Sequence, residues 1–412
     1  MKKTLLALFL GLALAGGAYA APCTIDQVPG ATLLLPYFEV DIADPAGVDT
    51  IFTVNNASAT AVLGHVVVWT DMSVEALDFN IYLTGYDMQT VSMGLMIRDG
   101  LLPITASDGQ DPTDAISPQG IISQDINFAS CSGIFPYDPL DPAYLAHLQS
   151  ILTGGPSSFY GGNCGGWDYD DGIARGYVTI DTVNACSLLK PCDPGYIEAF
   201  LTRQNALWGD WFIIEGGNNF AQGDALVALE AIESGPVYPY PNGTFWGRCY
   251  ANFPGTNPDY REPMPSIFGA VFFNNAAFSG GTDLLVWRDS LTPTDSDGFS
   301  CSGAPGWFPL GQNQVVVFDQ EENPEEGGCT ISPCPEELPL FILETQRIPV
   351  ADLNVTPNSG WIYMNLDQGS YHGQAWVVSM FKAEGRYSAG IAANQILSTC
   401  QTPGSVPFLP VP

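Results

Sequence analysis

The sequence predicts a mainly β protein in which two antiparallel β-sandwich (Ig-like) modules flank a loop-rich middle section that carries one or two short helices. Three observations support this fold class. Short runs of β-branched and aromatic residues recur along the chain, and Asp, Asn, Gly and Ser fill the stretches between them. Gly and Pro are frequent, at 44 and 33 of 412 residues, as expected for many turns. Only 14% of the residues are charged, which argues against global disorder.

Residues 1–20 are predicted to be a secretory signal peptide that is cleaved after Ala20. Two lysines precede an apolar segment at residues 4–15, and residues 18–20 form a small-x-small cleavage site. A membrane-spanning helix needs about 20 apolar residues, and this run reaches two glycines before that length. We therefore expect an exported chain, secreted or located in the periplasm or at the cell surface, without membrane insertion.

Residues 21–135 are expected to form the first β-sandwich module. Residues 31–40, 50–54 and 61–70 are apolar or β-branched runs, and residues 77–83 alternate between apolar and polar positions. Both patterns are typical of strands, and a period of two predicts one buried face. The polar stretches between the runs are expected to be turns, so that successive strands pair in antiparallel fashion.

Residues 136–244 are expected to form an irregular middle section that contains disulfides. Asp141 is a suitable N-cap and a proline follows it at the first helical position, which predicts a helix that ends near residue 153. Residues 197–208 are a second helix candidate, whereas residues 176–183 have strand character.

Residues 245–412 are expected to form the second β-sandwich module. Its strand candidates are residues 268–273, 283–287, 314–318, 361–366 and 375–381. An Asn-Asn-Ala sequence followed by Val-Trp-x-Asp occurs around Trp69 and again around Trp287, which indicates a duplicated module. Coincidence between two β-rich segments is the alternative, and unrelated strand positions of the two tryptophans would reject the duplication.

The charge balance is strongly acidic. The chain has 44 Asp and Glu residues against 12 Lys and Arg residues, and its formal net charge is −32. Nucleic acids and anionic membrane surfaces are bound by clustered bases, so neither is expected as a partner. Cations, cationic partners and neutral polymers such as glycans remain compatible with this charge, and solubility outside the cell also explains it.

The ten cysteines are expected to form disulfides, because an even number in an exported chain is typical of a disulfide framework. A zinc site is not expected, since the chain has no Cys-x-x-Cys pair and only three histidines. Two of the pairs flank turns that contain proline, and the last follows by elimination. The predicted pairs are Cys186–Cys192, Cys329–Cys334, Cys131–Cys164, Cys249–Cys301 and Cys23–Cys400.

The sequence offers no catalytic residue. It has no Gly-x-Ser-x-Gly elbow, no His-Glu-x-x-His motif and no phosphate-binding glycine loop. His65, His147 and His372 have no motif around them. A glycosidase needs two carboxyl groups across a cleft, and the sequence does not select a pair among its 44 acids.

Two acidic turns are candidate calcium sites. Asp168, Asp170 and Asp171 lie in a glycine-rich loop, and Asp295 and Asp297 precede a glycine in a second turn. Alternate acids followed by glycine are typical of half a calcium loop, and neither turn has a full ligand set. Solvated acidic turns explain the same residues, because Asp and Gly are ordinary turn formers.

Several aromatic residues offer a second ligand class. Trp167, Tyr169, Trp208 and Trp211 stack on sugar rings in one interpretation and fill the core in the other. The sequence favours a non-catalytic exported protein with a structural, adhesive or binding role at or outside the cell envelope, with protein or glycan partners. The alternative is a secreted carbohydrate-active enzyme or glycan-binding module that uses acidic and aromatic loop residues.

Overall fold

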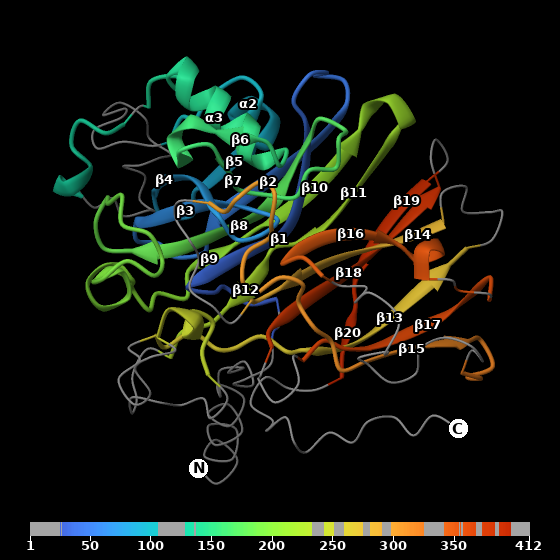
Figure 1. Cartoon of the computed structure of the whole chain (residues 1–412). Helices are drawn as coiled ribbons and strands as arrows, with labels where there is room; N and C mark the ends of the chain where they lie inside the picture. Colours follow the sequence, from blue (N-terminus) through green and yellow to red (C-terminus); the bar gives the residue numbers. More distant parts are fainter. Residues whose placement is uncertain are drawn as a thin grey trace, which may run out of the picture.

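The computed structural model describes most of the chain between residues 25 and 396 (Figure 1). The described residues are 25, 27–105, 128–135, 137–232, 243–250, 259–274, 281–290, 298–324, 342–353, 355, 357–367, 373–383 and 387–396. The predicted signal peptide lies outside them. Within them, no helix has the length and the apolar character that crossing a bilayer would require.

The protein is mainly β and contains several antiparallel sheets. Sheet I has the strand order β12-β1-β8-β3-β4. Its strands are β1 (Thr32–Asp41), β3 (Val62–Thr70), β4 (Glu75–Leu83), β8 (Ile173–Val183) and β12 (Val227–Leu229). The long apolar runs predicted at residues 31–40, 61–70 and 77–83 are confirmed as β1, β3 and β4.

Sheet II has the order β11-β10-β2-β5, and the short strand β9 also pairs with β2. Its strands are β2 (Val48–Asn56), β5 (Met88–Ser92), β9 (Leu207–Trp208), β10 (Asp210–Glu215) and β11 (Phe220–Ala225). Five strands of sheets I and II therefore come from the stretch expected to be an irregular middle section.

Sheets III and IV contain the later strands, drawn in yellow to red in Figure 1. Sheet III has the order β15-β17-β13-β20, and sheet IV has the order β16-β14-β18-β19. All five strands predicted in this part of the chain are confirmed. The strands are β13 (Ile267–Phe273), β14 (Gly281–Arg288), β15 (Gln314–Asp319), β16 (Thr345–Pro349), β17 (Ser359–Asn365), β18 (Ala375–Ala383), β19 (Tyr387–Ala392) and β20 (Asn394–Gln395).

The helical segments are short. The helix predicted after Asp141 is confirmed as α3 (Pro142–Leu152), and the Asp141 carboxylate accepts a hydrogen bond from the Ala143 N–H at 2.9 Å. The helix expected over residues 197–208 is wrong, because only one π-helical turn forms before the chain extends into β9. The remaining short elements are α2 (Met93–Ile97), β6 (Pro156–Ser157), β7 (Asn163–Cys164), η1 (Ala129–Cys131), η2 (Ser158–Tyr160), η3 (Tyr196–Phe200), η4 (Gly216–Asn218), η5 (Gly247–Tyr250) and η6 (Val350–Leu353).

Trp69 and Trp287 occupy corresponding positions in two sheets. Each is the penultimate residue of its strand, β3 in sheet I and β14 in sheet IV. Strand β3 lies between β4 and β8, and β14 lies in the same way between β16 and β18. The two tryptophans therefore do not occupy unrelated strand positions, and the duplication stays a prediction.

A closed ring of aromatic contacts joins sheets I and IV. Trp69 stacks on Tyr177 at 5.8 Å between ring centroids, and Tyr177 meets Trp287 edge-on at 5.9 Å. Phe245 stacks on Trp287 at 5.8 Å and contacts Trp246 at 4.8 Å, and Trp246 returns to Trp69 at 6.3 Å. All five side chains are buried, and one continuous hydrophobic core includes residues of all four sheets.

Three disulfides join distant segments, and the predicted pairing is wrong wherever the structure describes both cysteines. The observed bonds are Cys131–Cys186, Cys164–Cys301 and Cys192–Cys249. Cys23, Cys329, Cys334 and Cys400 lie outside the described residues.

Local contacts explain two of the observed disulfides. The Cys186 N–H donates to Ser130 Oγ at 3.0 Å, which brings Cys186 beside Cys131. Cys164 pairs with Phe299 through two backbone hydrogen bonds of 2.9 Å, which brings it close to Cys301. The two cysteines of each predicted pair bond to cysteines of other segments instead. This applies to Cys186–Cys192, Cys131–Cys164 and Cys249–Cys301.

Candidate functional site

The first predicted acidic loop is held by internal contacts. The Asp170 N–H donates to Asp168 Oδ1 at 2.8 Å, and both oxygens of Asp171 accept hydrogen bonds from Arg175, at 2.9 and 2.6 Å. Partial burial is the largest single effect and raises the pKa of Asp171, but the hydrogen bonds from Arg175 and from backbone N–H groups, together with the charge of Arg175, hold that pKa below its usual value. A cation at this loop would have to compete with Arg175 for Asp171.

The second predicted acidic turn, with Asp295 and Asp297, lies outside the described residues. Within the described part of the chain, no three His, Cys, Asp or Glu side chains come together in a way that could hold a metal ion. The calcium hypothesis therefore gains no support from the loop at Asp168.

The two described histidines are buried in structural contacts. His65 Nδ1 lies 3.2 Å from Asn80 Oδ1 across the β3–β4 pair. His147 Nδ1 lies 2.6 Å from Ser157 Oγ, and burial lowers the pKa of His147. This serine–histidine pair resembles a nucleophile and its base, but the Ser157 hydroxyl also accepts from the Phe159 N–H and caps a 3₁₀ turn. Ser157 and His147 are only 5% exposed, so we assign the pair a structural role.

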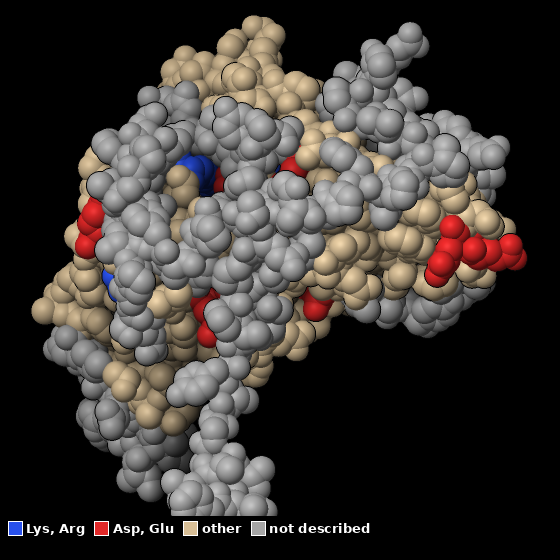
Figure 2. Space-filling model, turned by 90° about the horizontal axis from the view of Figure 1, so that it is seen from below, with Lys and Arg blue, Asp and Glu red and all other residues tan. Residues whose placement is uncertain are grey.

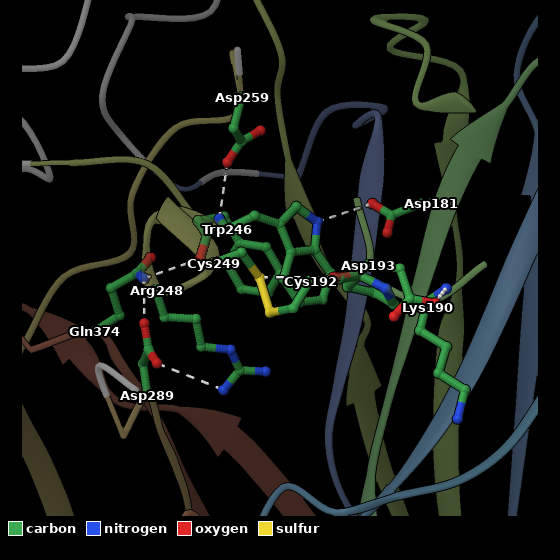
Figure 3. The surroundings of a disulfide bond; sticks show 12 residues. Asp181, Lys190, Cys192, Asp193, Trp246, Arg248, Cys249, Asp259, Asp289 and Gln374 are labelled. Carbon is green, nitrogen blue, oxygen red and sulfur yellow. Dashed lines mark hydrogen bonds and ion pairs between the residues drawn. A yellow bond between two sulfur atoms is a disulfide. The ribbon is translucent and has the colours of Figure 1, made fainter. Parts of the chain in front are cut away.

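Buried charges surround the Cys192–Cys249 disulfide (Figure 3). Arg248 Nη1 lies 3.5 Å from Asp289 Oδ1 and 3.7 Å from Glu344 Oε2, and the Gln374 amide donates to Asp289 Oδ2 at 2.8 Å. Burial raises the pKa of Glu344 to about 8, against the attraction of Arg248. These side chains are at most 7% exposed, so we assign the cluster a structural role.

Of the four aromatic residues predicted as stacking platforms, Trp208 is the most exposed. Trp211 is buried, and its indole N–H donates to the Ala225 carbonyl at 3.2 Å. Trp167 stacks on Phe308 at 5.5 Å, and the Tyr169 ring lies 4.4 Å from the Arg175 guanidinium carbon. Trp208 is 51% exposed.

Trp208 belongs to a surface cavity of about 360 Å³, which we call the Trp208 groove. Polar and apolar residues of sheet II and of the chain just before β1 contribute to it. The lining residues are Gln27, Val28, Trp208, Gly209, Asp210, Phe212, Gly223, Asp224, Ala225, Leu226 and Ala228.

Side chains alternate between the two faces of a strand, and this alternation explains which residues of the groove are exposed. Trp208, Asp210 and Phe212 occupy every second position along β9 and β10, and all three are exposed, whereas Gly209 and Trp211 between them are buried. The residues opposite on β11 are small, because Asp210 pairs with Ala225 and Phe212 pairs with Gly223. The groove therefore has aromatic rings and a carboxylate above a floor of small residues.

Gly223 is required for the position of the Phe212 ring. A Cβ atom added at Gly223 would lie 1.8 Å from the Trp211 carbonyl oxygen and 2.8 Å from Cδ1 of Phe212. Neither distance is tolerable for a real side chain, so the backbone or the ring would have to move. A glycine at this position keeps β11 close to β10 beneath the exposed ring.

Burial also affects a second carboxyl group of the groove. Burial raises the pKa of Asp224, and the negative charge of Asp210 raises it further, although backbone N–H groups oppose the shift. Asp224 Oδ1 accepts a hydrogen bond from the Ala225 N–H at 2.8 Å. Asp210 is the more exposed of the two carboxylates.

Sequence reasoning missed Asp210, Phe212 and Gln27 as groove residues. It named Trp208 but assigned the segment before it to a helix, which obscured the alternation of exposed and buried residues in 208–212. A test of this segment for a period of two would have found the three exposed positions.

A second cavity of about 370 Å³ lies where β16 meets sheets I and II. Arg347 Nη1 there contacts Glu39 Oε2 at 2.7 Å and Glu215 Oε1 at 3.2 Å, and its Nε contacts Asp283 Oδ2 at 2.6 Å. These ion pairs connect β16 to β1 and β10, so we assign them to the contact of sheet IV with sheets I and II.

Comparison with known proteins does not supply a function. No family model, no curated protein sequence and no solved structure matches this chain. The function therefore has to be argued from the groove itself.

Proposed function

We propose that this protein is an exported, non-catalytic binding protein at or outside the cell envelope, and that its Trp208 groove binds a glycan. One observation carries the proposal. Trp208 and Phe212 expose 51% and 45% of their surface on one face of a strand, above a floor of glycine and alanine. Aromatic rings with small neighbours allow a flat sugar ring to stack, while Asp210 and the Gln27 amide offer hydrogen bonds to hydroxyl groups.

Export is supported by the predicted signal peptide and by the disulfides. Three disulfides join segments that are 55, 137 and 57 residues apart. Such bonds persist in oxidising compartments and are rare in the cytosol. The proposal therefore places the protein in the periplasm, at the cell surface or in the medium, after cleavage following Ala20.

The two-module architecture is also part of the proposal. In sheet I, the order β1-β8-β3-β4 corresponds to β19-β18-β14-β16 in sheet IV. In sheet II, β2 lies between β10 and β5, as β13 lies between β20 and β17 in sheet III. We interpret sheets I and II as one β-sandwich and sheets III and IV as its duplicate. The similar sequences around Trp69 and Trp287 agree with this interpretation.

A glycan array with the mature protein tests the binding proposal. Trp208→Ala should weaken binding by roughly tenfold or more, because a stacked aromatic ring contributes roughly 0.5–1.5 kcal/mol beyond its buried area. Trp167→Ala is the matched control, since Trp167 is 40% exposed and does not line the groove. Binding that is absent, or that Trp208→Ala leaves unchanged, would overturn the proposal.

A hydrolytic enzyme is the second candidate, because Asp210 and Asp224 line one groove and the pKa of Asp224 is raised by burial. A carboxyl group with a raised pKa beside an ionised one is the pattern of glycoside hydrolysis. A polysaccharide-hydrolysis assay distinguishes the two candidates. Turnover that is lost in Asp224→Asn would replace the non-catalytic assignment with the enzymatic one.

A further inference from the structure

We infer that the glycan bound in the Trp208 groove carries protonated amines, as a polymer of non-acetylated amino sugars does. The inference rests on the proposed function and specifies its ligand class. It follows from the residues around Asp210 and from the arrangement of basic residues in the rest of the protein.

Asp210 lies between two exposed aromatic side chains. The three residues Trp208, Asp210 and Phe212 alternate along one strand face, so an ammonium group above Asp210 would also lie near a ring on either side. The faces of aromatic rings attract cations, and a carboxylate between the rings adds a charge pair. Acetylation of the amine removes both attractions, because an amide carries no charge.

Among the described residues that line the groove there is neither Lys nor Arg. An anionic sugar would meet the exposed Asp210 carboxylate without a base, whereas a cationic sugar would compensate it.

The basic residues of the described part of the chain are engaged elsewhere. Each of their side chains contacts a carboxylate, a carbonyl oxygen or an aromatic ring of the same chain. These residues are Arg98, Arg175, Lys190, Arg203, Arg248, Arg261, Arg288, Arg347 and Lys382. On the face seen in Figure 2, only small areas of Lys or Arg reach the surface.

This arrangement leaves the acidic residues to determine the surface potential. The formal net charge of the chain is −32. Such a surface attracts polycations over distances of about a Debye length and repels polyanions. Long-range charge and the local chemistry of the groove therefore favour the same ligand class.

The test compares glucosamine oligomers with N-acetylglucosamine oligomers of equal length, at about pH 6, where primary amines are protonated. Calorimetric titration of the full mature protein should give a Kd that is roughly five- to tenfold lower for the glucosamine oligomer. Asp210→Asn should remove most of this preference. Asp138→Asn is the control, because it removes the same charge from an exposed residue that does not line the groove.

The outcomes separate the inference from the proposed function. Equal or tighter binding of the acetylated oligomer, still dependent on Trp208, would overturn the inference and leave glycan binding in place. Binding of neither oligomer, together with a negative glycan array, would overturn both. A preference for glucosamine that Asp210→Asn leaves unchanged would also overturn the inference, because the preference would then come from the overall charge alone. Circular dichroism confirms that Asp210→Asn folds.

Discussion

The buried carboxyl group of Asp71 should make the protein less stable as the pH rises. Asp71 follows β3, is 1% exposed and accepts a hydrogen bond from the Trp167 N–H at 2.9 Å through Oδ1, while its Oδ2 is buried without a hydrogen-bond partner among the described residues. Burial raises the pKa of Asp71 from 3.8 to about 7. The unfolded chain therefore loses this proton at a lower pH than the folded protein does. The stability that the neutral carboxyl group preserves at low pH is lost as the pH rises towards about 7.

The size of the effect follows from the shift. Each unit of pKa difference corresponds to about 1.4 kcal/mol, so ionisation of Asp71 should reduce the free energy of unfolding by roughly 3 kcal/mol between about pH 5 and about pH 8. Asp71→Asn keeps an oxygen for the Trp167 N–H and cannot ionise, so the variant should lose this part of the pH dependence.

Urea unfolding of the disulfide-intact protein, followed by tryptophan fluorescence at several pH values, measures this difference. The free energy of unfolding of Asp71→Asn, relative to that of the unaltered protein, should increase by roughly 3 kcal/mol from about pH 5 to about pH 8. Glu344, whose pKa burial raises to about 8, contributes in the same direction to both proteins and cancels in the comparison. Stability curves that stay parallel across this pH range, as expected for the exposed control Asp138→Asn, would refute the reasoning.

Three further outcomes are expected. Gly223→Ala should weaken glycan binding and also lower stability, because the added Cβ would lie 2.8 Å from Cδ1 of Phe212 and 1.8 Å from the Trp211 carbonyl oxygen, and titration beside thermal unfolding measures the two effects. Asp141→Ala should lower the free energy of unfolding by about 1 kcal/mol through loss of the α3 N-cap, measured by urea unfolding, and Asp141→Asn should restore most of it. Peptide mapping of non-reduced protein should recover Cys192 linked to Cys249, and a peptide in which Cys192 is linked to Cys186 would contradict the observed fold.

Long strands with a strong pattern were predictable from the sequence, whereas short strands were not. Residues 61–70 contain a dense run of β-formers, and they form an interior strand of sheet I, between β8 and β4. Strand β9 has two residues and β12 has three, so neither is long enough to show a period of two. Their place in the fold depends on pairing with β2 and β1, which are more than a hundred residues away in the chain.

The disulfides show the same limit. Spacing predicted pairs between cysteines that are near in the chain, but the observed bonds join cysteines that are 55, 137 and 57 residues apart. The candidate site was predictable in part. Trp208 was recognisable as an aromatic residue that could stack on a sugar ring, but the positions of Asp210 and Phe212 beside it depend on pairing with Ala225 and Gly223 of the next strand, whose register no local pattern reveals.

The scarcity of bases and the acidic character of the surface have a common physical explanation. Arg248 and Arg261 are at most 5% exposed and are paired with carboxylates, and Arg347 connects β16 to Glu39 and Glu215. Removing one partner of such a buried pair is strongly destabilising, so these bases are committed to the fold. Because these three bases are held in ion pairs inside the protein, they do not add positive charge to the surface, where Asp and Glu dominate. The same ion pairs that stabilise the junction therefore give the Trp208 groove its acidic surroundings, and an added lysine near the groove, such as Gln27→Lys, should weaken binding of a glucosamine oligomer without disturbing the junction.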